Sequence, residues 1–193
     1  METGNHGGES NHRSCVWHNQ SFGKTGCKYS LVCGTGADQL LGYKTGHVLT
    51  ADNLENRFTS RYMDIPNTPL YPFGFGLSYT EFDISDVEVR MEQDKRVHVH
   101  CKVSNKGNVA GAEVVQCYYE TLHASVVRPQ KELVRFQKVF LDPGEKKNVD
   151  FYIDPKEFSY YDKNMEVVST GMKLRISVGN SSDHEWGSSE LYI

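Results

Sequence analysis

Residues 97–103 read Val-His-Val-His-Cys-Lys-Val, and this stretch decides the fold. Val97, Val99, Cys101 and Val103 alternate with polar residues, so a β-strand formed here has one apolar face and one polar face. A period of two is typical of a strand that covers a core with one side only. The pattern therefore predicts a sheet protein in this part of the chain.

The same alternation recurs toward the C-terminus, at 149–153 and 174–178. Turn signals separate the strands, and in Asp142–Glu145 the Pro and Gly fall at the second and third positions, as a type II turn requires. We expect strands near 82–90, 96–104, 111–121, 130–141, 146–153, 164–168 and 172–179, with a last edge near 188–193. About seven strands fit an all-β, two-sheet sandwich of roughly 100 residues.

Composition limits the classes of function. The chain has 193 residues, 38% hydrophobic and 24% charged, with a formal net charge of -4, values typical of globular proteins with one or two small domains. It is too short for a barrel enzyme, and no apolar run approaches the roughly 18 residues of a membrane helix. Residues 1–6 do not resemble a signal peptide, and no Lys/Arg stripe is present. We expect no nucleic-acid and no membrane partner, and the compartment stays open.

Residues 1–42 differ from the rest of the chain. They hold 8 of the 17 Gly and 3 of the 5 Cys, no Pro, and no sustained apolar period, which predicts a poorly ordered tail. Gly34-Thr35-Gly36 lacks the third Gly of a nucleotide-binding loop. Five residues of metal-ligand type fit no standard zinc spacing: His12, Cys15, His18, Cys27 and Cys33. We therefore expect no cofactor and no metal.

Pro66–Tyr79 connects the tail region to the sandwich. Its three Pro and two Gly exclude a long helix or a central strand, so we expect an extended linker. The aromatic residues Tyr71, Phe73 and Phe75 form an apolar patch that needs a larger body to pack against.

Several motifs, among them Phe58–Tyr79, Ala110–Gln116 and Arg128–Leu133, resemble those of one enzyme family. This family is glycoside hydrolase family 3, which holds β-glucosidases and β-xylosidases. Phe58–Tyr79 is similar to the segment that leaves the second catalytic domain of these enzymes. Ala110–Gln116, Arg128–Leu133, Leu141–Glu145 and Val178-Gly179 are similar to their C-terminal fibronectin type III-like domain. The resemblance covers about 43–193. It implies an immunoglobulin-like sandwich over 81–193 and, over 43–80, the end of the α/β sandwich domain with its linker.

The resemblance also implies what the chain lacks. Family members are retaining glycosidases that use two carboxyl groups about 5 to 5.5 Å apart. Both groups belong to domains that precede the matched segment, so we assign no catalytic residue. Asp64, Glu81 and Asp83 are expected to be linker and strand-end carboxylates in surface pairs.

Two pairs of residues in the expected strands have alternative interpretations. Cys101 and Cys117 fit either a disulfide or two buried free thiols, and the apolar setting favours the thiols. His98 and His100 have a spacing that metal sites use, but a solvated face is the simpler expectation.

Two other features also have alternative interpretations. Arg128–Leu133 is either a loop that faces the catalytic domains or an ordinary surface connection. Trp186 is either a platform for sugar stacking or a strand anchor, and the absence of neighbouring aromatic residues in the sequence favours the anchor.

Three functions follow as hypotheses. The first is a C-terminal fragment of a β-glycosidase, an accessory domain that braces the catalytic domains, is inactive alone, and meets oligosaccharide only through the intact enzyme. The second is a stand-alone β-sandwich module that binds carbohydrate or protein. The third is a small metal-responsive protein that depends on the tail. The Pro-rich aromatic linker favours the first, because a self-sufficient module has no need of it.

Residues 1–41 also suggest a displaced reading frame. Read one nucleotide later, the codons of Lys24–Ser30 are compatible with Lys-Leu-Ala-Val-Ser-Ile-Pro, and those of Gly34–Gln39 with Gly-Gln-Val-Pro-Ile-Asn, which the family carries before the linker. We expect resequencing of the gene to show that a one-nucleotide shift restores these residues up to about Gly42. A shifted frame that encodes other residues, or stops inside the segment, would contradict this.

Overall fold

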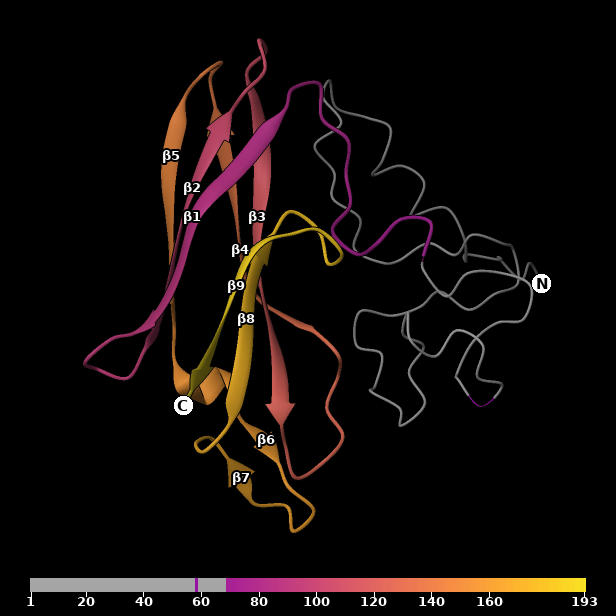
Figure 1. The fold of residues 1–193 in the computed structure, drawn as a ribbon, viewed down its shortest axis with the longest axis vertical. Helices are drawn as coiled ribbons and strands as arrows, with labels where there is room; N and C mark the ends of the chain where they lie inside the picture. Colours follow the sequence, from indigo (N-terminus) through magenta and orange to yellow (C-terminus); the bar gives the residue numbers. More distant parts are fainter. Residues whose placement is uncertain (1–57, 59–68) are drawn as a thin grey trace, which may run out of the picture.

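The computed structural model describes residue 58 and residues 69–193, and over this range the chain is almost entirely β-structure (Figure 1). Its elements, in order, are β1 (Phe82–Met91), β2 (Val97–Asn105), β3 (Gly111–His123), β4 (Glu132–Leu141), β5 (Lys146–Ile153), the 3-10 turn η2 (Pro155–Phe158), β6 (Tyr160–Tyr161), β7 (Val167–Val168), β8 (Lys173–Gly179) and β9 (Glu185–Tyr192).

The strands form two antiparallel sheets and a small hairpin. One sheet has the order β1-β2-β5, the other β4-β3-β8-β9, and β6 pairs with β7. In Figure 1 the strands of both sheets run along the long axis of the molecule, and the β6–β7 hairpin lies at its lower end. The apolar sides of the two sheets meet in one core, so the expected all-β, fibronectin type III-like sandwich is confirmed.

Strand β2 is the middle strand of its sheet, and its row of apolar side chains explains how the β1-β2-β5 sheet packs on the core. Val97, Val99, Cys101 and Val103 all point into the core and are completely buried. The three valines have partners on both neighbouring strands; Val99, for example, lies opposite Val89 of β1 and Phe151 of β5. Cys101 pairs with Val149 of β5 and faces an irregularity in β1. A slip of one residue would turn this row toward the polar side, so the register is strongly specified.

The turns follow the sequence signals. The Asp142–Glu145 turn closes with a hydrogen bond from the Glu145 N–H to the Asp142 carbonyl at 3.0 Å. Gly144 has a φ of 74°, the left-handed conformation that the third position of a type II turn needs. The expected turn is confirmed, and it holds β4 and β5 at the same end of the two sheets.

Two elements differ from expectation. The expected strand at 164–168 is only the two-residue β7, which pairs with an unexpected β6. A turn between them replaces regular strand, because the Asp162 carboxylate accepts hydrogen bonds from the backbone N–H groups of Asn164 and Glu166. Strand β9 also begins earlier than expected, at Glu185, because Gly187 pairs with Val178 of β8.

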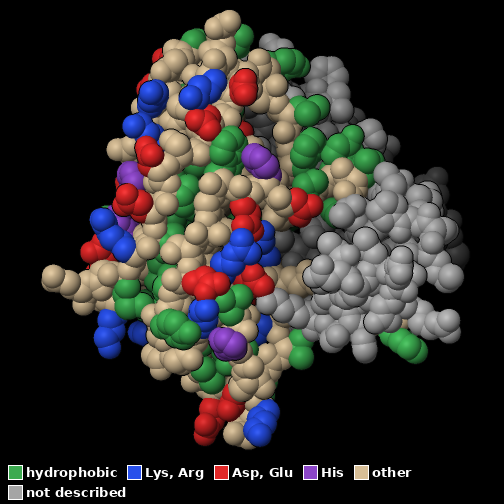
Figure 2. Space-filling view, viewed as in Figure 1, with side chains coloured by type: hydrophobic (Ala, Val, Ile, Leu, Met, Phe, Trp, Pro, Cys, Tyr) green, Lys and Arg blue, Asp and Glu red, His purple; other side chains and the backbone are tan. Residues whose placement is uncertain are grey.

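Charged side chains of both signs lie on the face of the molecule that Figure 2 shows. Figure 2 shows acidic and basic side chains intermixed on the face viewed there, while hydrophobic side chains gather at the upper right, where Figure 1 places residues 69–80. Among the described residues, no helix is long and apolar enough to cross a membrane.

Candidate docking site

Residues 69–80, which we call the strap, lie on the outer face of the larger sheet. The Phe73 carbonyl accepts a hydrogen bond from the Ser182 N–H at 2.8 Å, and the Gly74 carbonyl accepts one from Gln116 Nε2 at 3.4 Å. Ser182 follows β8 and Gln116 lies within β3, so the strap is attached to two neighbouring elements. The predicted extended linker is therefore part of the sandwich surface.

Gln116 is the central side chain of this attachment. Its neighbours Val115 and Cys117 point into the core, so Gln116 points to the outer face, yet it is only 2% exposed. Its amide oxygen accepts a hydrogen bond from the Tyr118 hydroxyl, and its amide nitrogen donates to the Asn180 carbonyl at 2.7 Å. Burial raises the pKa of Tyr118, so the hydroxyl stays protonated and available as a donor.

Lys131 covers this buried pair from the side. Its Nζ lies 5.5 Å from the centre of the Tyr118 ring, donates to the Ser182 carbonyl at 2.7 Å and forms an ion pair with Glu185 at 2.5 Å. One lysine thereby connects the loop after β3 to the loop after β8, which supplies the Ser182 N–H to the strap.

Gly74 allows the strap to approach the sheet closely. Its φ is 79°, which side-chain-bearing residues rarely adopt, and a Cβ at this position would overlap the amide of Gln116. Glycine is therefore required here for both backbone conformation and space.

The other end of the strap is fixed near the end of β2. Thr80 Oγ1 donates to Asn105 Oδ1 at 2.6 Å, and the Gly107 N–H donates to the same oxygen at 3.0 Å. Asn105 Nδ2 in turn donates to the carbonyls of Val109 and Leu141. The strap is thus held at two places, by β3 and the loop after β8 at Phe73-Gly74 and by the end of β2 at Thr80.

The Arg128–Leu133 loop is held by its own domain. Arg128 donates to the Tyr119 hydroxyl at 3.2 Å and to Glu132 at 2.7 Å, and its guanidinium lies 5.3 Å from the centre of the Tyr160 ring. These contacts support the interpretation of the loop as a surface connection.

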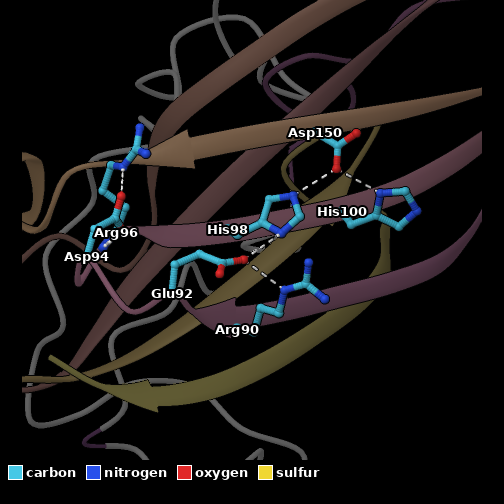
Figure 3. A network of polar contacts seen from close by, with 7 residues as sticks. All are labelled: Arg90, Glu92, Asp94, Arg96, His98, His100 and Asp150. Atoms are coloured by element: carbon cyan, nitrogen blue, oxygen red, sulfur yellow. Dashed lines mark hydrogen bonds and ion pairs between the residues drawn. The ribbon is translucent and has the colours of Figure 1, made fainter.

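The two histidines of β2 form the polar cluster in Figure 3. His98 Nε2 and His100 Nδ1 both approach Asp150 Oδ1, at 2.8 and 2.9 Å, while Glu92 lies 3.3 Å from His98 Nδ1 on the opposite side. The ring of His98 also stacks on Tyr152 at 4.5 Å. The hydrogen bonds from His100 and His98 lower the pKa of Asp150.

The expectation of a solvated face is therefore wrong for His98, which is 5% exposed. It failed because Tyr152 and Glu92 come from other strands or turns and cover the ring. Within the described range, no group of three or more His, Cys, Asp or Glu has the geometry of a metal site.

Cys101 and Cys117 are buried free thiols, as the sequence favours. Burial raises the pKa of each to about 12. Both thiols are protonated at neutral pH and consequently unreactive.

Trp186 packs against the core and meets His184 edge to face at 4.9 Å, as expected of a strand anchor.

Two of the three carboxylates considered as catalytic candidates, Glu81 and Asp83, lie within the described residues. Asp83 pairs with Lys106 at 3.4 Å, which confirms a strand-end surface pair, and Glu81 is exposed. Asp64 lies outside the described residues, as do the five Cys and His of the tail and the displaced frame at 1–41. That the chain holds no catalytic residue stays a prediction.

Sequence reasoning missed the residues that attach the strap. Gln116 occurs in one of the quoted motifs, but Asn180 and Ser182 lie in a polar loop without a recognisable pattern. A polar residue within the otherwise apolar run Val114–Tyr119 was the available signal for Gln116.

The fold and the attached strap define a fibronectin type III-like β-sandwich, and comparisons with known proteins agree. The family model of the fibronectin type III-like domain matches residues 113–182. The periplasmic β-glucosidase of Salmonella typhimurium is 41% identical over 140 residues, which are 70% of this chain and 18% of that protein. Thermostable β-glucosidase B of Acetivibrio thermocellus is 44% identical over 128 residues, 63% of this chain and 17% of that protein.

Solved structures give the same result. The crystal structure of β-glucosidase from Listeria innocua in complex with isofagomine matches with a TM-score of 0.73 and 38% identity, over 79% of this chain and 22% of that chain. The family 3 β-glucosidase of Bifidobacterium adolescentis matches with a TM-score of 0.60 and 35% identity, over 64% of this chain and 18% of that chain.

The chain matches the C-terminal, fibronectin type III-like part of glycoside hydrolase family 3 β-glucosidases. It spans about a fifth of the length of the relatives that it matches.

We expect Gly74→Ala to loosen the strap. The substitution combines the strain of a positive φ, about 1–2 kcal/mol, with a steric overlap on Gln116 that adds about 1–3 kcal/mol. Gly144→Ala is the matched control, because its φ is 74° but nothing lies within 4 Å of the added Cβ. Urea unfolding and chymotrypsin cleavage at Tyr71–Phe75 measure the effect. If Gly74→Ala and Gly144→Ala lowered the free energy of unfolding equally, contact between the strap and Gln116 would not be the cause of the destabilisation.

We expect Asp150→Asn to lower the free energy of unfolding by less than about 1 kcal/mol at neutral pH, because the carboxylate is half-exposed. The folded-state pKa of Asp150 is lowered, so its contribution is present above the unfolded value, about 3.9, and is lost as the pH falls through the folded value. Urea unfolding between pH 7 and pH 3 should show the two proteins converging on the acid side. Asp86→Asn, whose carboxylate lies 3.8 Å from Lys102, is the control. If the free energies of unfolding of the two proteins differed by the same amount from pH 7 to pH 3, the stabilising role given to the Asp150 carboxylate would be contradicted.

Proposed function

We propose that this chain is the accessory β-sandwich that braces the catalytic domains of a β-glycosidase and hydrolyses nothing alone. The single observation that carries the proposal is the strap, which is bound to the sandwich by hydrogen bonds at Phe73 and Gly74 in its middle and at Thr80 at its C-terminal end. Because these bonds fix the strap, a body joined to it is held near one face of the sandwich.

The strap supports this role in its exposed side chains as well. Leu70, Tyr71, Leu77 and Tyr79 are all exposed, although the strap between them is hydrogen-bonded to the sandwich at Phe73 and Gly74. A domain that functions alone has no reason to hold such side chains outward, whereas a domain that contacts a larger body does. The partner is therefore the catalytic part of the parent glycosidase, and oligosaccharide is bound by that part.

A chimera tests the proposal. Residues 69–193 replace the corresponding C-terminal part of the Salmonella typhimurium periplasmic β-glucosidase, which is 41% identical to this chain over 140 residues. We expect the 193-residue chain to release no p-nitrophenol from p-nitrophenyl β-D-glucoside. The chimera should hydrolyse this substrate and unfold in one thermal transition, and the same enzyme truncated before the strap should unfold at a lower temperature.

Two results would contradict the proposal. A chimera that unfolds in two separate transitions would show that the sandwich does not brace its neighbour. Calorimetric titration of the chain with cello-oligosaccharides or xylo-oligosaccharides that gave a micromolar Kd would support a stand-alone carbohydrate-binding module.

A further inference from the structure

Strand β4 carries two exposed aromatic side chains on the same face of the sheet as the strap. Phe136 is 67% exposed and Phe140 is 54% exposed. The register places Phe136 directly opposite Gln116 of β3, and Phe140 opposite Ala112. Residues opposite one another in a sheet lie on the same face, with Cβ atoms about 5 Å apart.

The strap fixes which face this is. The Gln116 side chain donates to the strap at Gly74, so Phe136 lies beside the strap on the outer face. Residues two apart along a strand share a face, which places Phe140 on it too. The core side of the same strand holds Val139 and Leu141, both buried.

We infer that Phe136 and Phe140, together with the exposed strap residues Leu70, Tyr71, Leu77 and Tyr79, form the surface that docks onto the catalytic part of the parent glycosidase. We call these six residues the docking face. The inference rests on the proposed function and deepens it, because it names the surface of contact and its apolar chemistry.

Continuity with the strap identifies the occupant. The strap already packs on this side of the sheet, and the body that precedes it is joined to the sandwich at residue 69. A short connection gives that body an effective concentration of about millimolar at the docking face, whereas a second copy of the chain has to associate from dilute solution. Strand β4 is also an edge strand, and a covering body protects both its aromatic side chains and its open edge.

Cysteine labelling tests the inference in the 193-residue chain and in the chimera. Lys138→Cys places a thiol between Phe136 and Phe140 on the docking face, and Asn148→Cys places one on an exposed position of β5 in the other sheet. Peptide mapping after iodoacetamide treatment reports each site separately. We expect the Lys138→Cys site to react at least tenfold more slowly in the chimera than in the chain, with no change at Asn148→Cys.

A second pair of variants tests the aromatic residues themselves. Phe136→Ser with Phe140→Ser in the chimera should restore fast labelling of the Lys138→Cys site and split the single thermal transition into two. Tyr161→Ser is the control, because Tyr161 is 61% exposed but belongs to the β6–β7 hairpin. Tyr161→Ser should change neither the labelling rate of the Lys138→Cys site nor the single thermal transition of the chimera.

Each other outcome has a distinct meaning. A chimera that unfolds in one transition while the Lys138→Cys site reacts as fast as in the chain would overturn the docking face and leave the proposed function standing. Two transitions in the unsubstituted chimera would overturn both. Protection of the site in the chain that increases with protein concentration would show that a second copy is the occupant, which also overturns the inference.

Discussion

The buried amide of Gln116 is the constraint on which the arrangement of strap and sandwich depends. An amide removed from water has to keep its hydrogen bonds, because an unsatisfied buried polar group costs about 1–3 kcal/mol. Tyr118, Asn180 and Gly74 provide those partners, and Gly74 belongs to the strap itself. Removing the strap would expose a side chain that is only 2% exposed in the assembled domain. The segment that joins the sandwich to its neighbour is consequently part of the sandwich's own hydrogen-bond network.

This constraint links the fold to the proposed function. The two-sheet core positions β3 and β8, these two strands supply Gln116 and the loop after Gly179, and these hold the strap on one face. Phe136 and Phe140 remain exposed on the same face of the sheet as the strap. The polar cluster around His98 lies on the other sheet and stabilises that sheet through Asp150, without a role in docking.

Most of the fold could be predicted from the sequence, because strand alternation is a local signal. The row from Val97 to Val103 and the Pro-Gly turn at 143–144 report on their own conformation, and both were found as expected. The burial of His98 could not be predicted in this way, since it depends on Tyr152, which is distant in sequence, and on the position that the turn after β1 gives to Glu92. The role of Gln116 in attaching the strap was also hidden, because Gly74 and Asn180 lie more than forty residues away from it along the chain.

Hydrogen exchange at the Ser182 amide is the most direct test of the attached strap, since this N–H donates to the Phe73 carbonyl at 2.8 Å. If the strap is bound to the sandwich as described, the Ser182 amide in the 193-residue chain exchanges far more slowly than an unstructured amide and as slowly as its neighbours in β8. Exchange of this amide at the unprotected rate, with β8 still protected, would contradict the bound strap.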